Sequence, residues 1–74
     1  MINKLSFIVG KNIKKYRKKL DISQEKLAEK SGLHRTYIGG IERGERNITL
    51  DSLQIIAFAL NIAPVELLVE EKNV

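Results

Sequence analysis

The chain has 74 residues, a hydrophobic content of 43% and a formal net charge of +4 at pH 7. It contains no cysteine, which excludes a disulfide framework and a thiolate metal site, and we expect residues 1–74 to form one small domain to which oligomerisation adds stability. No apolar run approaches the roughly 20 residues that span a membrane, and the apolar part of the N-terminus is too short for a secretory signal, so we expect a cytoplasmic protein.

The charges are distributed unevenly along the chain. Residues 1–50 hold twelve Lys and Arg against five Asp and Glu, whereas residues 51–74 hold one Lys against four acids. A basic front and an acidic back suggest an oriented surface for a polyanion. Taken alone, the basic residues are explained equally well as lysines that only solvate the first helix.

The first predicted helix runs from about Ser6 to Leu20, with Ser6 as its N-cap. Apolar residues recur in it at helical spacing, at Val9, Ile13, Tyr16 and Leu20. Six basic residues lie between Lys11 and Lys19 on its other faces. Some of them could reach phosphate, and many only face solvent.

The second predicted helix follows a short link and is capped by Ser23. Glu25 lies in its first turn, where the helix dipole favours an anion. The capping box is incomplete, because the third helical position holds Lys26 rather than Glu or Gln. We expect this helix to end near Ser31, with Gly32 in the left-handed conformation that glycine adopts at little cost.

The third predicted helix begins close to His34 and ends near Arg43, with Gly44 as its C-terminal stop. Its apolar stripe is formed by Leu33, Ile38 and Ile41. Two short helices that meet at a sharp turn are typical of a helix-turn-helix, whose second helix enters the DNA major groove. The sequence therefore predicts a DNA-binding unit between residues 24 and 43.

Two adjacent glycines, Gly39 and Gly40, lie inside this third helix. Each costs a helix about 1 kcal/mol relative to alanine, so the pair needs a structural reason. We expect that reason to be close approach of the helix to DNA or to another helix.

Two further helices are expected after a polar loop. Thr49 is a good N-cap for the fourth helix, which closes at Asn61. Its predicted buried face consists of Leu50, Leu53, Ile56, Ala57 and Leu60. Ala63 and Pro64 open a fifth helix, since proline suits the first helical position, and the residues after 69 fray as an acidic tail. The predicted fold is therefore all-α, with five helices in one compact domain.

The C-terminal third holds more apolar residues than one small core needs. We assign part of this surface to a two-fold dimer interface formed by Ile62, Val65, Leu68 and Val69. Two recognition helices would then lie about one DNA turn apart, roughly 34 Å, on successive half-sites.

Residues at the start of the recognition helix are the candidates for base contact. Arg35 can form two hydrogen bonds to guanine, although an arginine here can also hold a phosphate. Thr36 offers a hydroxyl or a methyl group, His34 lies at the helix start near DNA, and Gly40 permits close approach. A lone histidine without acidic or thiol partners is a poor metal or catalytic candidate.

A second group of residues is predicted to hold the DNA backbone. Gln24 opens the second helix, where its backbone N–H and side-chain amide can both meet a phosphate. Tyr37 can bind a phosphate through its hydroxyl, or it can be a core tyrosine instead. The remaining candidates are Arg43, Arg46, Asn47 and Ser52.

Nearly the whole chain resembles the five-helix DNA-binding domain of phage repressors, through the pattern SQEKLAEKSGL followed by IERGER. Within that superfamily, the string LHRTYIGGIERGERNITLDSL is similar to the controller proteins of bacterial restriction–modification systems. The resemblance implies a homodimer that binds a pseudo-palindromic operator upstream of its own gene. It further implies activation and then, at higher occupancy, repression of that gene and of the restriction endonuclease.

The same resemblance implies two further roles. It places Arg17 and Glu42 in contact as a structural ion pair between the first and third helices. In related phage activators, acidic residues of the second helix contact the RNA polymerase sigma subunit, which suggests that role for Glu25 and Glu29. The alternative for these acids is pairing with Lys30 or simple solvation.

Other functions are less well supported by the sequence. A phage-type repressor or antitoxin that only represses is the main alternative, and a protein-interaction module that uses the same fold is another. An enzyme is the least expected, because we find in the sequence no paired carboxylates, metal cluster, phosphate-binding glycine loop or Ser–His–Asp set. Neither a metal nor a cofactor is expected.

Overall fold

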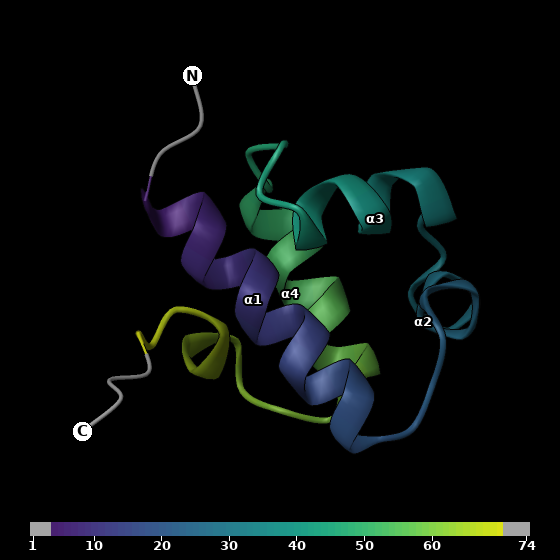
Figure 1. The fold of residues 1–74 in the computed structure, drawn as a ribbon. Coiled ribbons are helices and arrows are strands. Elements are labelled where there is room, and N and C mark those ends of the chain that lie inside the picture. Colours follow the sequence, from purple (N-terminus) through teal and green to yellow (C-terminus); the bar gives the residue numbers. More distant parts are fainter. Residues whose placement is uncertain (1–3, 71–74) are drawn as a thin grey trace.

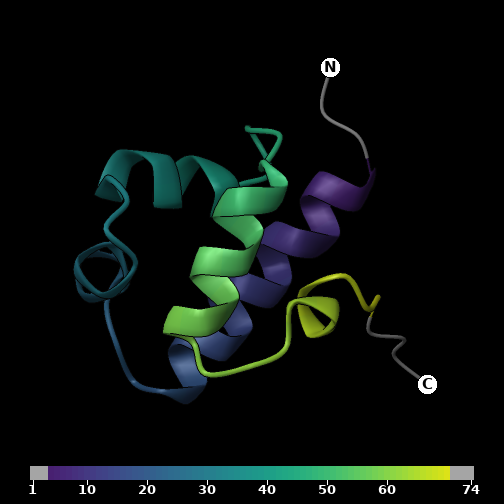
Figure 2. The same ribbon diagram turned by 180° about the vertical axis from the view of Figure 1, so that it is seen from behind.

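The computed structural model describes residues 4–70, which form four α-helices and one 3₁₀ turn. In chain order these elements are α1 (Lys4–Lys19), α2 (Gln24–Ser31), α3 (Arg35–Glu42), α4 (Leu50–Ala59) and η1 (Pro64–Leu67). Figure 1 shows α1 crossing in front of α4, with α3 lying over one end of the pair. Seen from behind in Figure 2, α2 and η1 lie on opposite sides of the two crossed helices.

The core joins all five elements. Each contributes at least one side chain with 0% exposure: Ile13, Leu27, Ile38 and Leu67 from the first three helices and η1, and both Ile56 and Ala57 from α4. Burial of one such aliphatic side chain contributes about 1.5–3 kcal/mol, so each element is held by its own anchor. The prediction of an all-α domain is confirmed within the described residues.

Close packing between α1 and α3 depends on Gly10, which is buried in the middle of α1. A β-carbon at this position would overlap the main-chain carbonyl oxygen of Ile41 and would lie 3.1 Å from that of Glu42. Neither oxygen can move without displacing the end of α3. The missing side chain therefore sets how near α3 lies to α1.

The prediction of a fifth α-helix is wrong. Residues Pro64–Leu67 form a single 3₁₀ turn, and the chain leaves the turn at Leu68. The physical reason is Asn12 on α1, whose side-chain Nδ2 donates hydrogen bonds to the carbonyl oxygens of Leu67 and Val69, each at 2.9 Å. These carbonyls are the acceptors that a longer helix would use for its own next turn. Residues 71–74 of the predicted acidic tail lie outside the described part of the chain.

Two predicted helix caps are confirmed. The Ser23 hydroxyl accepts a hydrogen bond from the backbone N–H of Lys26 at 2.9 Å, and the Thr49 hydroxyl accepts one from that of Ser52 at 3.0 Å. Gly32 ends α2 with φ of 75°, in the left-handed region as expected.

Three other expectations about helix ends and faces are wrong. Ser6 does not cap α1, which begins at Lys4; its hydroxyl instead donates to Asn47 Oδ1 at 2.8 Å. Leu20 lies beyond α1 and is 46% exposed, because Asp21 turns the chain away with φ of 57°. Leu50 is 83% exposed, since it stands at the first position of α4, where no other element covers it.

Candidate nucleic-acid interface

The α2–α3 unit has the geometry of a helix-turn-helix. The N–H of Gly32 donates to the carbonyl oxygen of Ala28 at 2.8 Å, which closes α2, and α3 begins three residues later at Arg35. Leu27 on α2 and Ile38 on α3 are both fully buried. This shared core fixes the angle between the two helices and turns the opposite face of α3 outward.

Arg35 and Thr36 lie in the first turn of α3, and both are exposed. Ile38 and Ile41 occupy the inner face of the same helix, with exposures of 0% and 1%. His34 precedes the helix as its N-cap residue, is exposed, and makes no capping hydrogen bond with its side chain. The start of the helix therefore presents a guanidinium, a hydroxyl and an imidazole to solvent.

Two of the predicted phosphate ligands, Tyr37 and Ser52, form a hydrogen bond with each other. The Tyr37 hydroxyl donates to Ser52 Oγ at 3.2 Å, which joins the first turns of α3 and α4. Arg46 lies over the Tyr37 ring, with its guanidinium carbon 5.7 Å from the ring centre. The tyrosine is only half-buried, so it combines an anchor at the edge of the core with a hydroxyl near the surface.

The two glycines of α3 make room for long polar side chains. A β-carbon on Gly40 would lie 3.0 Å from Nε of Arg46, and one on Gly39 would lie 3.1 Å from a terminal nitrogen of Arg43 and 3.5 Å from Oε1 of Gln24. No helix backbone is found among these nearest neighbours. The glycine pair thus leaves room beside α3 for three of the side chains that are predicted to bind the DNA backbone.

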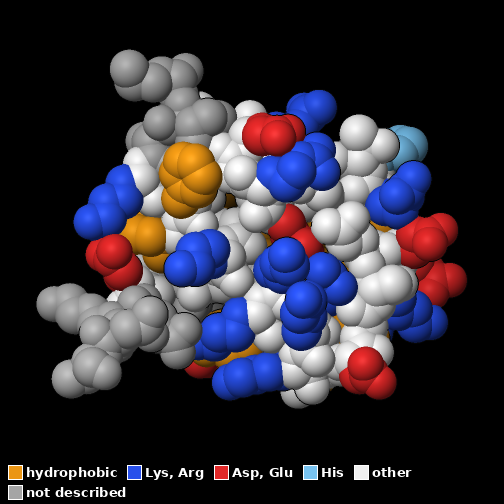
Figure 3. Space-filling view, in the orientation of Figure 1, with side chains coloured by type: hydrophobic (Ala, Val, Ile, Leu, Met, Phe, Trp, Pro, Cys, Tyr) orange, Lys and Arg blue, Asp and Glu red, His pale blue; other side chains and the backbone are white. Residues whose placement is uncertain are grey.

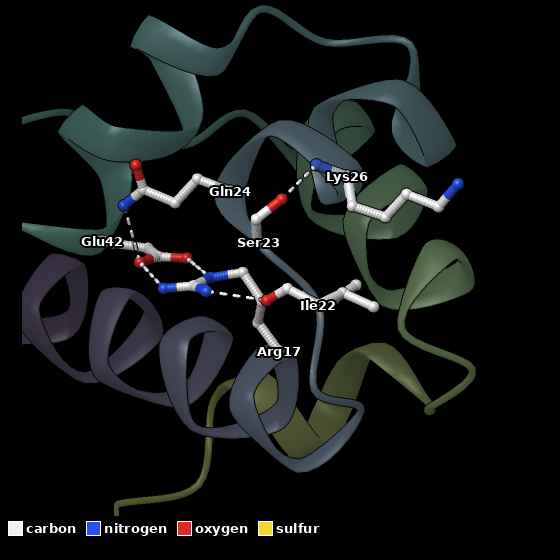
Figure 4. A network of polar contacts seen from close by, with 6 residues as sticks. All are labelled: Arg17, Ile22, Ser23, Gln24, Lys26 and Glu42. Atoms are coloured by element: carbon white, nitrogen blue, oxygen red, sulfur yellow. Dashed lines mark hydrogen bonds and ion pairs between the residues drawn. The ribbon is translucent and has the colours of Figure 1, made fainter.

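A buried ion pair ties this surface to α1, as Figure 4 shows. Arg17 donates through Nε to Oε2 of Glu42 at 2.7 Å and through Nη2 to Oε1 at 3.0 Å, and its Nη1 donates to the carbonyl oxygen of Ile22 at 2.9 Å. The side chains of Arg17 and Glu42 are 10% and 2% exposed. The Glu42 carboxylate, mainly through its hydrogen bonds, raises the pKa of Arg17.

Gln24 joins the same network. Its Nε2 donates to Oε1 of Glu42 at 3.0 Å, so the side-chain amide predicted to hold a phosphate is already oriented by the ion pair. Sequence reasoning found Gln24 and Glu42 separately and missed their contact, for which the sequence carries no local signal.

The loop after α3 carries the other predicted backbone ligands. Arg43 pairs with Glu45 through Nε at 3.1 Å, and both side chains are more than half exposed. Asn47 is held by the hydroxyl of Ser6. Gly44 has φ of 75° and turns the chain so that this loop follows α3 closely.

The acidic residues of α2 lie on its outer surface. Glu25 and Glu29 are both exposed. Glu29 pairs with Lys26 at 2.8 Å rather than with Lys30, and this hydrogen bond lowers the pKa of the Glu29 carboxyl. Both acids therefore present a carboxylate at the surface, that of Glu29 in an exposed pair with Lys26.

An apolar surface is exposed on α4 and around η1. Of the predicted interface residues, Val65, Leu68 and Val69 are 60%, 40% and 57% exposed, while Ile62 is half-buried. Sequence reasoning missed Phe58, which is 86% exposed and shares a face of α4 with Leu50. The spacing of eight residues between these two was the available signal, because it places them two turns apart on one stripe.

Comparison with known proteins agrees with this geometry. A helix-turn-helix family model matches residues 13–67. The control protein C.SmaI of Serratia marcescens is 53% identical over 64 residues, which cover 86% of this chain and 76% of that protein. The chain belongs to the helix-turn-helix family, as a controller protein of the restriction–modification type.

Solved structures of controller proteins support the same assignment. The restriction–modification controller protein C.AhdI from Aeromonas hydrophila superposes with a TM-score of 0.81 at 44% identity, covering 84% of this chain and 94% of that one. The controller protein C.Esp1396I, solved as a tetramer with its natural 35-base-pair operator, superposes with a TM-score of 0.82 at 45% identity, covering 88% and 86%. This controller protein is thus a DNA-binding transcription regulator built on a helix-turn-helix.

Residues 4–70 were also considered as a membrane segment and as a metal site, and they fit neither. None of the helices there combines the length and apolar content needed to cross a bilayer. No group of three or more His, Asp or Glu side chains is arranged to hold a metal ion in this range.

Proposed function

We propose that this controller protein binds, as a homodimer, a pseudo-palindromic operator upstream of its own gene. It controls expression of a restriction endonuclease, as an activator at low occupancy and a repressor at high occupancy. The observation that carries the proposal is the exposed first turn of α3, where Arg35 and Thr36 face solvent beside a cluster of positioned polar side chains. The operator complex of the similar protein C.Esp1396I supports it.

In this proposal, the side chains divide into those that read bases and those that hold phosphates. Arg35 contacts a guanine, and Thr36 and His34 contact neighbouring base edges. Gly40 allows close approach of the helix to DNA once the Arg46 side chain, which lies over this buried glycine, turns toward a phosphate. The phosphate-binding set consists of Gln24, Tyr37, Arg43, Arg46, Asn47 and Ser52. Phosphate contacts fix the register on the duplex and carry no sequence information directly.

The dimer interface is assigned to the exposed apolar surface on α4 and η1. Phe58, Leu50, Val65 and Val69 are each more than half exposed, which leaves a large apolar area open to solvent. Such area is typical of a surface that another protein chain covers. A two-fold axis through this face would leave both copies of α3 free for successive half-sites.

We expect Phe58→Asp to dissociate the dimer, because it places a charge in the middle of that apolar face. Sedimentation equilibrium should show a monomer, and operator affinity should fall at least about a hundredfold, since each half-site then binds alone. Lys30→Ala on α2 is the matched control, because it lowers the net charge by the same amount and Lys30 is exposed away from the apolar face of α4 and η1. Equal loss of dimer in both variants would move the interface away from Phe58.

A gel-shift titration at physiological salt tests the operator itself. One duplex is the DNA immediately upstream of the gene, and the other is unrelated DNA of equal length. The proposal requires the upstream duplex to bind at least about a thousandfold tighter, the lower end for specific binders. Two successive complexes would support paired operators, and weak, equal binding of both duplexes would overturn self-regulation.

Activation is assigned to contact between α2 and the sigma subunit of RNA polymerase. Glu25 and Glu29 are exposed and four residues apart, hence on one face of the helix. We expect Glu25→Gln with Glu29→Gln to reduce activated transcription in a reporter assay about fivefold or more, the scale of a coupling of one kcal/mol. Operator affinity in a gel shift should stay within about twofold, and a parallel loss of affinity would place these acids in DNA binding instead.

The reporter assay also separates the alternatives. A phage-type repressor or antitoxin would show repression at every protein concentration, with no activated range. A protein-interaction module without DNA function would show no salt-sensitive binding to any duplex.

A further inference from the structure

A groove lies along α1 and extends from Phe7, beside the loop after α3, to the side of the helix turned away from α3. It has a volume of about 470 Å³ and is lined by Lys4, Phe7, Ile8, Lys11, Lys15 and Glu70, with Asn12 at its base. Figure 3 shows orange apolar surface bordered by blue and red side chains on this part of the molecule. We propose that this groove binds an acidic segment of a partner protein that also carries an apolar side chain.

The lining matches such a ligand in both of its properties. Phe7 is 53% exposed and Ile8 is half-buried, so the groove offers an apolar surface that a large side chain can cover. Lys4, Lys11 and Lys15 are spaced by seven and four residues, which places three cations on the same face of α1. The helix itself contains six lysines and no acidic residue.

Glu70 shows that a carboxylate fits against this lysine row. Its Oε2 lies 3.5 Å from Nζ of Lys4, and both side chains are about half or more exposed. An exposed pair of this kind is weak, at about 0–1 kcal/mol, so an external carboxylate can exchange with it. The contact is a small internal example of the interaction we propose for a partner.

The position of the groove argues against operator DNA as its occupant. Gly10 faces α3, as its contact with Ile41 shows. At 100° per residue, Ile8 and Lys15 point about 140–160° away from Gly10 around α1. A duplex held on the outer face of α3 therefore leaves the part of the groove at Ile8 and Lys15 open, and a phosphate backbone has no group that would cover the apolar side chains of Phe7 and Ile8.

The groove is also distinct from the proposed dimer face. Neither Phe58 nor Leu50, the two most exposed apolar residues of α4, lines it. The inference goes beyond DNA binding and stands without it, because it rests on other residues. A partner docked here would be carried to wherever the protein binds.

The choice of test residues follows from what Phe7 touches. A β-carbon on Gly44 would lie 2.8 Å from Cδ1 of Phe7, so this ring supports the loop that carries Arg43 and Arg46. A substitution of Phe7 would disturb the candidate DNA interface as well as the groove. The lysines of the rim avoid that ambiguity.

The test compares Lys11→Glu with Lys15→Glu against Lys14→Glu with Lys18→Glu. The two double variants have the same charge and lie on the same helix, but Lys14 and Lys18 do not line the groove. The probe is a short fluorescein-labelled peptide in which Glu and Asp alternate with Leu and Phe, measured by fluorescence anisotropy at physiological salt. An oligoglutamate peptide of equal charge is the reference probe. The corresponding Lys→Gln pairs replace these variants where charge reversal disturbs the circular dichroism spectrum.

We expect the groove variant, Lys11→Glu with Lys15→Glu, to weaken binding of the amphipathic peptide at least about tenfold. The control variant, Lys14→Glu with Lys18→Glu, should weaken it less than about threefold, because the carboxylates of the peptide pair with the lysines nearest to them. Oligoglutamate should bind at least about tenfold more weakly than the amphipathic peptide, because it cannot cover the apolar floor. Equal losses in the two variants, equal binding of the two peptides, or no peptide binding would overturn the proposal. Dissociation of the dimer by the groove pair alone would assign the groove to a second copy of the chain and would also overturn it.

Discussion

Glu42→Gln is expected to lower the free energy of unfolding by about 3–5 kcal/mol, because it leaves the Arg17 guanidinium buried without its counter-charge. The side chains of the two partners are only 10% and 2% exposed, so solvent cannot replace the lost carboxylate. Urea denaturation followed by circular dichroism measures the change. For a domain of this size, such a loss is a large fraction of the total stability.

The double variant Arg17→Met with Glu42→Leu separates the charge from the packing. Apolar replacement of a whole buried pair is often close to neutral, so we expect this variant to recover most of the stability lost in Glu42→Gln. It removes the acceptor for Gln24, which then loses its fixed orientation. If the double variant is no more stable than Glu42→Gln, the cost lies in packing or in the lost bond to Ile22 rather than in an unpaired charge.

Arg35→Ala is expected to remove most of the preference for the operator while leaving the fold intact. One bidentate arginine–guanine contact contributes about 1–3 kcal/mol of discrimination, and a dimer loses two of them, so specific affinity should fall roughly a hundredfold or more. Arg35 is exposed in this structure, so its removal should leave the urea midpoint almost unchanged. Gel-shift titrations on operator and unrelated duplexes give the ratio that reports this loss.

Lys30→Ala is the matched control for this measurement. Lys30 is exposed near the C-terminal end of α2 and has the same charge, so its removal changes the net charge equally. We expect it to reduce affinity for both duplexes slightly and alike, as a general electrostatic effect. Should Arg35→Ala behave in the same way, with an unchanged ratio between the duplexes, Arg35 would hold a phosphate instead of reading a base.

Helix ends, the sharp turn and the helix-turn-helix are set by short stretches of sequence. Ser23 and Thr49 cap α2 and α4 as predicted, and Gly32 ends α2 in the left-handed conformation. Each of these features depends on one side chain and on backbone groups within four residues of it. For that reason the helix caps and the left-handed glycine can be predicted without knowledge of the rest of the chain.

The hydrogen bonds between residues of the candidate site could not be predicted from the sequence. Tyr37 bonds to Ser52 fifteen residues away, and Gln24 bonds to Glu42 eighteen residues away. The site residues were proposed one by one from helix position, but their mutual contacts depend on how α2, α3 and α4 pack together. Arg17 and Glu42 were paired beforehand only through the family resemblance.

The sequence by itself determined the all-α class, the order of the first four helices and the exposed start of the recognition helix. Only the tertiary structure decided which apolar residues are buried. Leu67 is fully buried while its neighbour Leu68 is 40% exposed, and Leu50 is exposed although it follows the apolar spacing of α4. The reason is that periodicity identifies a helix face, whereas burial requires another element to cover it, and Asn12 places Leu67 in the core by binding main-chain groups 55 and 57 residues away.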